Sequence, residues 1–428
     1  MTDPAVVQRR TLRLLFVTQI ISGIGVAIGS SVGALLAADL AGVGVSGLAQ
    51  SATVVGAALL ALPAAALVHR HGRRPSLAAA YLVAAVGSML VVLAAMRGSI
   101  PLLFAGFLLF GGATAANLQA RYTAVDLAPA ERRGRHLSLI VWATTLGAVA
   151  GPSLAPFAGA TLAAYGVPTL AGPFFFSALL LTVAACCLLL LLRPDPAIVA
   201  RLATDSPQQP ARAPIGTALR AVVSRTPARL AVSAMAVGHL VMVGVMAMTP
   251  VHIRGAGHDA AHTLRIVGVV LSSHVAGMYA FAPVMGLLTD KLGRRPVIFT
   301  GIALLLIACA VAGSAGHSPA RLAIGLTVLG LGWSATMVAG STLLNDSVPV
   351  ELRVPSQGLS DLTMGLAGAS AGAVSGVIVD AWGYPTLTLL TALATVPLIV
   401  WVTVSRGGLG ARPLRAHTPP SPGSQPES

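Results

Sequence analysis

The sequence predicts an all-α integral membrane protein whose twelve transmembrane helices form two pseudo-symmetric six-helix bundles. Only 9% of its 428 residues are charged and 55% are hydrophobic, whereas about 25% of the residues in a soluble globular domain are charged. Twelve apolar segments are each long enough for a membrane crossing, which takes about 20 residues. A short basic turn also occurs once in each half of the chain, which indicates that the halves are repeats.

The apolar segments fall into two groups of six, separated by a stretch rich in proline and arginine. We expect a first bundle at residues 1–192, a cytoplasmic linker at 193–229, a second bundle at 230–405 and a disordered cytoplasmic tail at 406–428. A short amphipathic helix is expected near 215–224 in the linker. The apolar segments run roughly over 12–38, 46–68, 76–96, 100–122, 137–160, 170–192, 230–251, 264–288, 297–315, 319–343, 357–379 and 384–405.

The net charge of +14 reflects membrane topology and does not indicate nucleic-acid binding. With both termini in the cytoplasm, most of the 27 Lys and Arg residues fall in cytoplasmic segments. The exceptions are Arg97, Arg254, Arg265, Arg321 and, inside a span, Arg121. This positive-inside distribution predicts a multi-pass membrane protein, with anionic lipid headgroups as partners of its basic loops. The use of 26 arginines to one lysine indicates a bacterium with a GC-rich genome, so we expect a bacterial cytoplasmic membrane.

Neither metal nor cofactor chemistry is expected. Cys186, Cys187 and Cys309 all lie in apolar segments and have no disulfide or metal spacing. The loop histidines after residue 251 lack the spacing of a zinc site. No apolar span carries a Ser-Lys pair, paired aspartates or a His-Glu-x-x-His run, so the protein is not expected to be an enzyme.

The basic turn marks corresponding points in the two halves. The second copy reads GLLTDKLGRRP from Gly286 to Pro296, and the first reads AALVHRHGRRP from Ala65 to Pro75. Asp290 of the second copy therefore corresponds to His69 of the first. Two further segments are repeated. YGVPTL (165–170) corresponds to WGYPTL (382–387), and DLAPAE (126–131) corresponds to DSVPVE (346–351).

The turn GLLTDKLGRR resembles the cytoplasmic signature that the major facilitator superfamily carries between the second and third helices of a half. The resemblance covers essentially the whole chain, and it implies a secondary transporter whose halves rock around a site near the bilayer midplane. Gly147, Gly151 and Pro152 in the fifth helix are similar to the glycine-proline motif of proton-coupled exporters in that superfamily. This implies a bent fifth helix that seals one side of the pathway; the alternative is ordinary packing of small residues.

Charges at the cytoplasmic helix ends are predicted to form a conformational gate. They would bind partners when the cytoplasmic side is closed and separate when the halves rock; the alternative is that they only fix topology. Asp361, near the start of the eleventh helix, is predicted to face His69 and replace the acid missing there, or to be an ordinary acid at a helix start. The predicted gate residues are His69, Arg70, Gly72, Arg73, Arg74, Arg121, Asp126, Gly286, Asp290, Lys291, Gly293, Arg294, Arg295 and Asp361.

Asn117, Gln119 and Arg121 form the most polar patch inside any predicted span. Asn117 and Arg121 are four residues apart, so they share one face of the fourth helix. An ionisable residue inside the membrane is costly and is a functional candidate by default. Arg121 is interpreted as a gate residue or structural partner of Asp126, or alternatively as a substrate contact.

The predicted substrate or proton pathway consists of polar and aromatic residues near the middle of their spans. His239 and His274 lie at similar depth in the seventh and eighth helices, and imidazole titrates near pH 6.5. They suit proton coupling or an anionic substrate; the alternative is that they are hydrogen-bonded packing residues. Gln19, Asn117 and Trp333 are the other candidates for lining a cavity.

We therefore expect export of small organic molecules by alternating access, with protons as the coupling ion and one chain as the functional unit. The alternatives are uptake of a nutrient or metabolite by the same fold, and a transporter-like sensor without transport.

Overall fold

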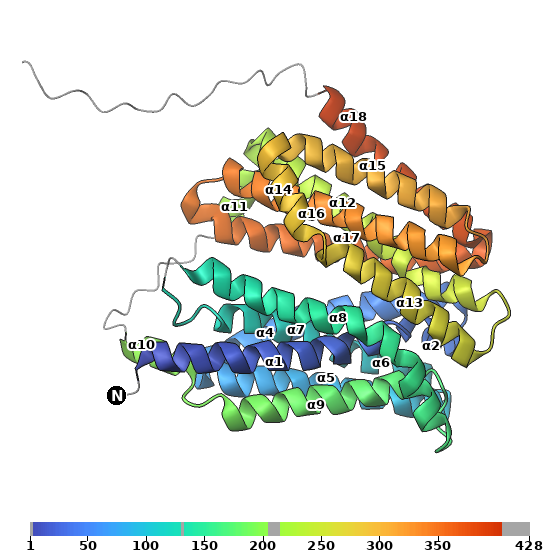
Figure 1. The fold of residues 1–428 in the computed structure, drawn as a ribbon, viewed down its shortest axis with the longest axis horizontal. Coiled ribbons are helices and arrows are strands. Elements are labelled where there is room, and N and C mark those ends of the chain that lie inside the picture. Colours follow the sequence, from blue (N-terminus) through green and yellow to red (C-terminus); the bar gives the residue numbers. More distant parts are fainter. Residues whose placement is uncertain (1–2, 130–131, 204–214, 405–428) are drawn as a thin grey trace, which may run out of the picture.

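The structure, a computed structural model, describes residues 3–129, 132–203 and 215–404, and helices are the regular secondary structure of these ranges. Figure 1 shows the helices of the first half gathered on one side of the molecule and those of the second half on the other. The first half consists of α1 (Pro4–Ser30), α2 (Gly33–Ala41), α3 (Val43–Ser46), α4 (Leu48–His71), α5 (Arg73–Arg97), α6 (Ile100–Phe110), α7 (Gly112–Thr123), α8 (Arg133–Ala163) and α9 (Gly172–Leu191).

Two short helices follow in the linker, and the second half repeats the pattern of long helices. The linker helix α10 contacts α1, whereas α11 contacts two helices of the second half, α12 and α17. The elements are α10 (Pro196–Ala203), α11 (Ile215–Ser224), α12 (Thr226–Arg254), α13 (Ala260–Tyr279), α14 (Ala282–Leu292), α15 (Arg294–Gly313), α16 (Pro319–Ser347), η2 (Val350–Leu352), α17 (Arg353–Leu393) and α18 (Val396–Val404). The amphipathic helix expected near 215–224 is confirmed as α11.

The described residues hold eleven helical segments that are long and apolar enough to cross a membrane. The last, Val350–Trp401, has 52 residues, more than twice the ~20 that one crossing takes. Gly383 interrupts it with φ 81° and ψ 169°, so it contains the eleventh and twelfth crossings. The predicted fold class of twelve helices in two bundles is confirmed. The predicted tail at 406–428 and Glu131 lie outside the described residues.

Three crossings that the sequence predicts as continuous are broken. The first crossing breaks at Ser31 and Val32, between α1 and α2, and the eighth breaks at Ala280 and Phe281, between α13 and α14. The fourth breaks at Gly111, where a Cβ atom would lie 2.3 Å from the carbonyl oxygen of Thr53. Hydropathy does not report such breaks, because an interrupted helix that lines a protein interior stays apolar along its length.

The duplication is also present in the backbone. Gly72 and Gly293 end α4 and α14, and both have a φ of 92°. Gly166 and Gly383 open the sixth crossing of each half with φ values of 77° and 81°. All four backbones lie in the left-handed region, which glycine enters at little cost, so the repeated segments adopt the same turn in both halves.

The two halves contact each other closely at one end. We call the end with the turns at Gly72 and Gly293 the basic end, and the other the opposite end. At the opposite end α4 packs against α17: a Cβ atom on Gly47 would lie 2.0 Å from the carbonyl oxygen of Gly372. The hydroxyls of Ser153 in α8 and Ser272 in α13 are 2.8 Å apart. Backbones this close need glycine at the crossing.

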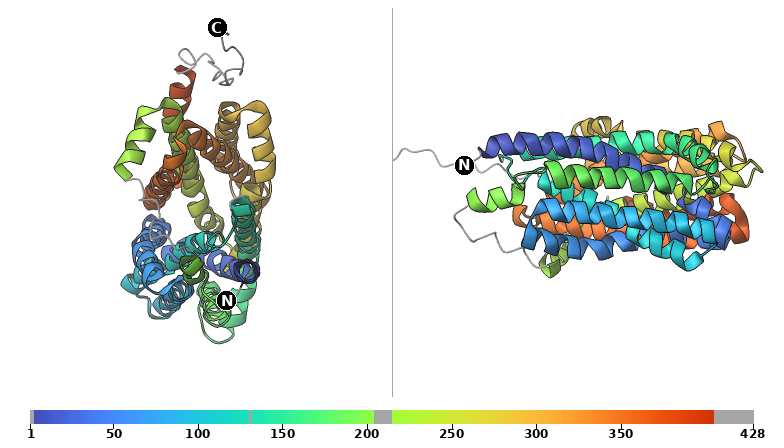
Figure 2. Two further views of the ribbon diagram at one scale, coloured as in Figure 1. Left: turned by 90° about the vertical axis from the view of Figure 1, so that its left-hand side faces the viewer. Right: turned by 90° about the horizontal axis from the view of Figure 1, so that it is seen from below.

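The basic end is open by comparison. At Gly134 in α8, Gly286 in α14 and Gly358 in α17, nothing lies within 4 Å of where a Cβ atom would be. The left-hand view of Figure 2 looks onto the basic end and shows the two halves as separate groups of helices. The halves are therefore joined at the opposite end and apart at the basic end.

Candidate functional site

Three side chains of the second half form an aromatic cluster. The indole N–H of Trp333 in α16 donates a hydrogen bond to Nδ1 of His239 in α12 at 3.1 Å. Tyr279, the last residue of α13, packs edge-on against the same indole, with ring centroids 5.8 Å apart. An indole N–H is only a donor, so Nδ1 of His239 is the acceptor and carries no proton. The predicted pathway residues His239 and Trp333 are thus a bonded pair.

Arg121 of α7, in the first half, interacts electrostatically with Tyr279 of this cluster and with Asp361 of α17. Among the described residues, no ion pair joins Arg121 to Asp361. The Nε atom of Arg121 is buried and has no hydrogen-bond partner there. Arg121 is therefore within electrostatic range of Asp361 and Tyr279 of the other half, and its guanidinium keeps bonding capacity.

Tyr279 was not among the sequence candidates. Its position four residues before Pro283, inside an apolar span, was the available signal, because a proline there disrupts the helix. The break between α13 and α14 follows Tyr279 directly.

Polar side chains of the first half form a buried network behind Asn117. The Gln19 amide donates to the Tyr81 hydroxyl at 2.7 Å and accepts from Thr144 at 3.0 Å. Tyr81 in turn donates to Oδ1 of Asn117 at 2.7 Å, and Ser22 donates to the same oxygen at 3.2 Å. Gln19 is fully buried, so in this conformation it positions Tyr81 and does not line the site. Asn117 is half-buried, and its NH₂ group has no partner in the described ranges.

His274, the second predicted pathway histidine, is bonded inside its own half. Its Nδ1 is 2.8 Å from the Leu326 carbonyl oxygen, and because a carbonyl can only accept, Nδ1 carries the proton. The side chain is fully buried, and its Nε2 has no partner within the described residues. His239 and His274 thus hold their protons on different ring nitrogens.

The basic turns form one charge pair in each half. Arg73 donates from Nε and Nη2 to the two carboxylate oxygens of Asp126 at 2.8 and 2.9 Å, and from Nη1 to Gln119 at 2.7 Å. In the second half Arg294 donates to Asp346 at 2.9 Å. The first pair is the more buried, with side-chain exposures of 14% and 15% against 34% and 49%. Arg73 therefore pairs with Asp126, the residue proposed from the sequence as a partner of Arg121.

Asp195, which was not among the sequence candidates, joins the first basic turn to the linker. Its carboxylate accepts from the backbone N–H of Arg74 at 2.8 Å and from that of Ala197 at 2.9 Å. It therefore caps the starts of α5 and α10 together. Arg201 of α10 donates to the carbonyl oxygens of Val68 and His69 at the end of α4. The available signal was an aspartate directly before Pro196, the usual pattern of a helix start.

The other charged residues of the turns are exposed in this conformation, namely His69, Arg70, Asp290 and Lys291, while Arg74 and Arg295 are half-buried. Within the described ranges no hydrogen bond or ion pair joins His69 to Asp361. The His69 carbonyl accepts from Arg201, and Asp361 interacts with Arg121. The pairing of His69 with Asp361 stays a prediction for a state in which the basic end is closed.

The glycine-proline segment of α8 makes two kinds of contact. A Cβ atom on Gly147 would lie 2.4 Å from the carbonyl oxygen of Ile20 in α1, and one on Gly151 would lie 2.6 Å from the Cβ atom of Ala27. These glycines therefore pack α8 against α1 within the half. The Pro152 carbonyl faces Gly268 of the other half at the opposite end; because Pro156 has no N–H, that carbonyl lacks its helical donor.

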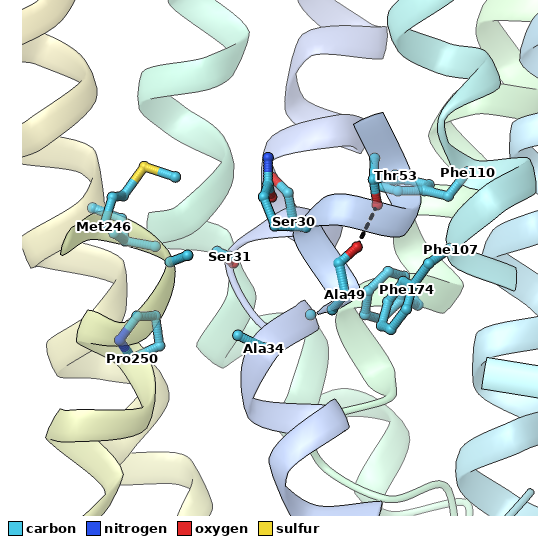
Figure 3. A pocket seen from close by; sticks show the side chains of 14 residues that line it. Ser30, Ser31, Ala34, Ala49, Thr53, Phe107, Phe110, Phe174, Met246 and Pro250 are labelled. Atoms are coloured by element: carbon cyan, nitrogen blue, oxygen red, sulfur yellow. Dashed lines mark hydrogen bonds between the residues drawn. The ribbon is translucent and has the colours of Figure 1, made fainter. Parts of the chain in front are cut away.

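A small cavity lies between the halves near the opposite end, at the break between α1 and α2. Its volume is about 30 Å³, enough for about one water molecule. Figure 3 shows phenylalanine rings on one side of it and Met246 and Pro250 on the other. The labelled lining residues are Ser30, Ser31, Ala34, Ala49, Thr53, Phe107, Phe110, Phe174, Met246 and Pro250.

Comparison with protein families matches this chain to the Major Facilitator Superfamily over residues 15–266 and 257–426. The chain belongs to the major facilitator superfamily. It is 38% identical to the Uncharacterized MFS-type transporter YdeG of Bacillus subtilis, over 93% of this chain and 92% of the relative. It is 27% identical to the Riboflavin transporter RfnT of Brucella anthropi, over 94% and 97%. Membership in this superfamily makes the chain a membrane transporter of small molecules.

Solved structures of this superfamily share the fold at low identity. The nucleoside transporter NupG superposes with a TM-score of 0.68 at 15% identity, covering 93% of this chain and 98% of that one. A bacterial homologue of the human lysosomal transporter Spinster, in an inward-facing and unoccupied conformation, superposes with a TM-score of 0.64 at 14% identity, covering 94% and 96%. At such identity the likeness concerns the fold.

Proposed function

We propose that this superfamily member is a proton-coupled transporter that exports small organic molecules across a bacterial cytoplasmic membrane. One observation supports it most. Arg121 of the first half interacts with Asp361 and Tyr279 of the second, so a site made by both halves changes whenever the halves move apart. Such a shared site is what alternating access requires.

In this proposal the basic end faces the cytoplasm, as the distribution of Lys and Arg favours. The conformation described here is then open to the cytoplasm and closed outside by the contact of Gly47 with Gly372. Closure of the basic end would bring α14 toward α8 and α4 toward α17. The unoccupied space at Gly286, Gly134 and Gly358 leaves room for that approach, and the exposed charges of the turns supply its ion pairs.

The half-chains would move as the units 1–192 and 230–405, tied by the linker 193–229. Because both halves of the site lie in one chain, we propose a monomer as the functional unit.

His239 and Asp361 are the proposed proton carriers. Nδ1 of His239 accepts from Trp333, so a proton can bind there only after that bond breaks. Protonation would release Trp333 and with it the packing against Tyr279. Asp361 interacts electrostatically with Arg121, and protonation would remove that attraction. Both protonation events alter the site where substrate would bind. Proton binding and substrate binding would therefore depend on each other, as proton-coupled transport requires.

The test is expression of the full chain in a strain that lacks its major efflux pumps, with a screen of toxic compounds and a proton-flux assay in inverted vesicles. We expect protection against some compounds, and proton movement when those compounds are added. The variant Asp361→Asn should lose the proton movement. If no compound is protected while uptake of a nutrient rises, export is ruled out in favour of uptake.

Riboflavin uptake is the second candidate function. RfnT, a riboflavin transporter, aligns along 94% of this chain, and the faces of Trp333 and Tyr279 suit a planar ring. Growth of a riboflavin auxotroph at limiting riboflavin would decide it: rescue supports uptake, and growth equal to that of the empty vector excludes it.

A further inference from the structure

We infer that the substrate is an aromatic organic anion, whose oxyanion binds Arg121 and Asn117 and whose ring packs against Tyr279 and Trp333. This rests on the proposed function, since it gives the substrate class of the same site.

Arg121 supplies the first argument. It lies in a membrane-spanning segment, where an unpaired charge is expensive. Its Nε is buried without a partner among the described residues, and no ion pair there includes it. A guanidinium presents N–H groups in a planar fork that fits a carboxylate or phosphate with two hydrogen bonds. A bound oxyanion would complete the coordination that the protein leaves open.

Asn117 supplies the second argument. It stands one helical turn from Arg121 on the same face of α7. Its Oδ1 already accepts from Tyr81 and Ser22, which leaves the NH₂ group to face outward. Both polar groups that α7 offers to the site are therefore donors. Two donors on one face of α7 favour an acceptor there, and an oxyanion is the strongest acceptor.

The second half supplies an apolar wall. The indole N–H of Trp333 is already bonded to His239, so Trp333 presents its ring rather than a donor. Tyr279 stands at 71° to that ring, so the two rings form a corner. An aromatic ring packs well into such a corner, face to one side chain and edge to the other.

Asp361 explains how the empty protein tolerates Arg121. It is the acid that interacts with Arg121, from the other half of the molecule and without an ion-pair contact. A substrate anion would replace that attraction with direct hydrogen bonds. Asp361 is thus a competitor of the substrate, so removing its charge should strengthen anion binding.

The experiment is isothermal titration calorimetry on the purified full chain in lipid nanodiscs. The probes are naphthoate, its uncharged isostere naphthamide, the cation naphthylmethylamine, and the non-aromatic cyclohexanecarboxylate. We expect naphthoate to bind at least about tenfold more tightly than each of the others. Arg121→Gln should reduce naphthoate binding to the level of naphthamide, and Trp333→Leu should reduce it to that of cyclohexanecarboxylate. Arg97→Gln, the same charge change at an exposed residue of the opposite end, should leave it unchanged.

Asp361→Asn provides a test that does not depend on the folding of Arg121→Gln, and it should tighten naphthoate binding severalfold. Equal binding of naphthamide, weaker binding to Asp361→Asn, or absence of naphthoate binding at millimolar concentration overturns the inference. Transport of neutral or cationic compounds without anion binding would refute the inference and leave the proposed function standing. Anion binding without transport would support the inference and refute the proposed function.

Discussion

The indole N–H of Trp333 and Nδ1 of His239 are joined by a hydrogen bond of 3.1 Å between the tenth and seventh crossings. This bond sets the tautomer of the histidine, and it excludes a proton from Nδ1 while it lasts. The pair therefore has two states, bonded and neutral or separated and protonated. A proton-coupled carrier needs a residue whose protonation rearranges its site, and this pair meets that requirement.

Replacing His239 with Gln should remove the pH response and keep the bond, because a Gln carbonyl oxygen can also accept from Trp333. We expect His239→Gln to transport at fixed pH but with a flattened dependence of the rate on pH, because Gln has no titratable group. His274→Gln should keep the dependence, since His274 bonds a backbone carbonyl inside its half. Initial rates in proteoliposomes measure both. An unchanged pH profile in the double variant would exclude histidine from coupling.

The charge pairs of the two basic turns should differ in their contribution to stability. Asp126→Asn removes a two-bonded partner of Arg73 in a partly buried setting, and we expect a loss of about 1.5–3 kcal/mol. Asp346→Asn acts on an exposed pair and should cost at most ~1 kcal/mol. Apparent unfolding temperatures of the two variants in one detergent provide the comparison. A larger shift for Asp346→Asn would contradict the burial argument.

The close approach of Gly47 to Gly372 should control closure of the opposite end. A Val side chain at 47 would meet the backbone of α17, because its Cβ atom alone would lie 2.0 Å from the Gly372 oxygen. We expect Gly47→Val to favour the state that is open at the opposite end. Spin labels on α2 and α17 should then show a longer distance. Gly216→Ala is the matched control, because nothing lies within 4 Å of that position.

Removing Asp195 should free the linker helix α10 from the first basic turn. Its carboxylate caps α5 and α10 at once, and the loss of one cap costs about 1 kcal/mol. Asp195→Ala should therefore speed amide hydrogen exchange in the first turns of both helices. Exchange at the start of α15, where the corresponding turn lies in the other half, serves as the internal reference. Unchanged exchange in α5 and α10 would show that the cap is dispensable.

The proposed partner change of Asp361 can be tested by cross-linking. In this conformation Asp361 interacts with Arg121, and closure of the basic end should move it toward His69. We expect the double variant His69→Cys and Asp361→Cys to form a disulfide only when the basic end is closed. If no disulfide forms in either state, the hypothesis that Asp361 faces His69 and replaces the acid missing there is wrong.

Some features of the gate and site could be predicted from the sequence, and others could not. The repeated turns, their glycines and the helix α11 were predictable, because periodic hydropathy and turn residues are local features. The partners of the charges were not. Arg73, at the start of the third crossing, bonds Asp126 and Gln119 at the end of the fourth, 53 and 46 residues later, and Asp195 bonds a residue far earlier in the chain. Such contacts depend on how each helix is rotated about its axis.

Tyr279 shows the same limit within the site. In the sequence it is one aromatic residue in an apolar span, and Pro283, four residues later, marks only that the helix is disrupted there. The break after α13 and the packing of α16 bring it to Trp333, and the approach of the first half brings it to Arg121.

The sequence by itself determined the number of crossings, the duplication, the distribution of basic residues and the superfamily. Each follows from lengths and residue types along the chain, because the bilayer sets the span length and backbone hydrogen bonding forces the spans to be helical. Only the tertiary structure decided that Arg121 comes within electrostatic range of Asp361 and Tyr279, that Gln19 is enclosed in a network, and that the halves are joined at the opposite end. The physical reason is that these contacts arise between helices, from their rotation, their breaks and the relative position of the two halves.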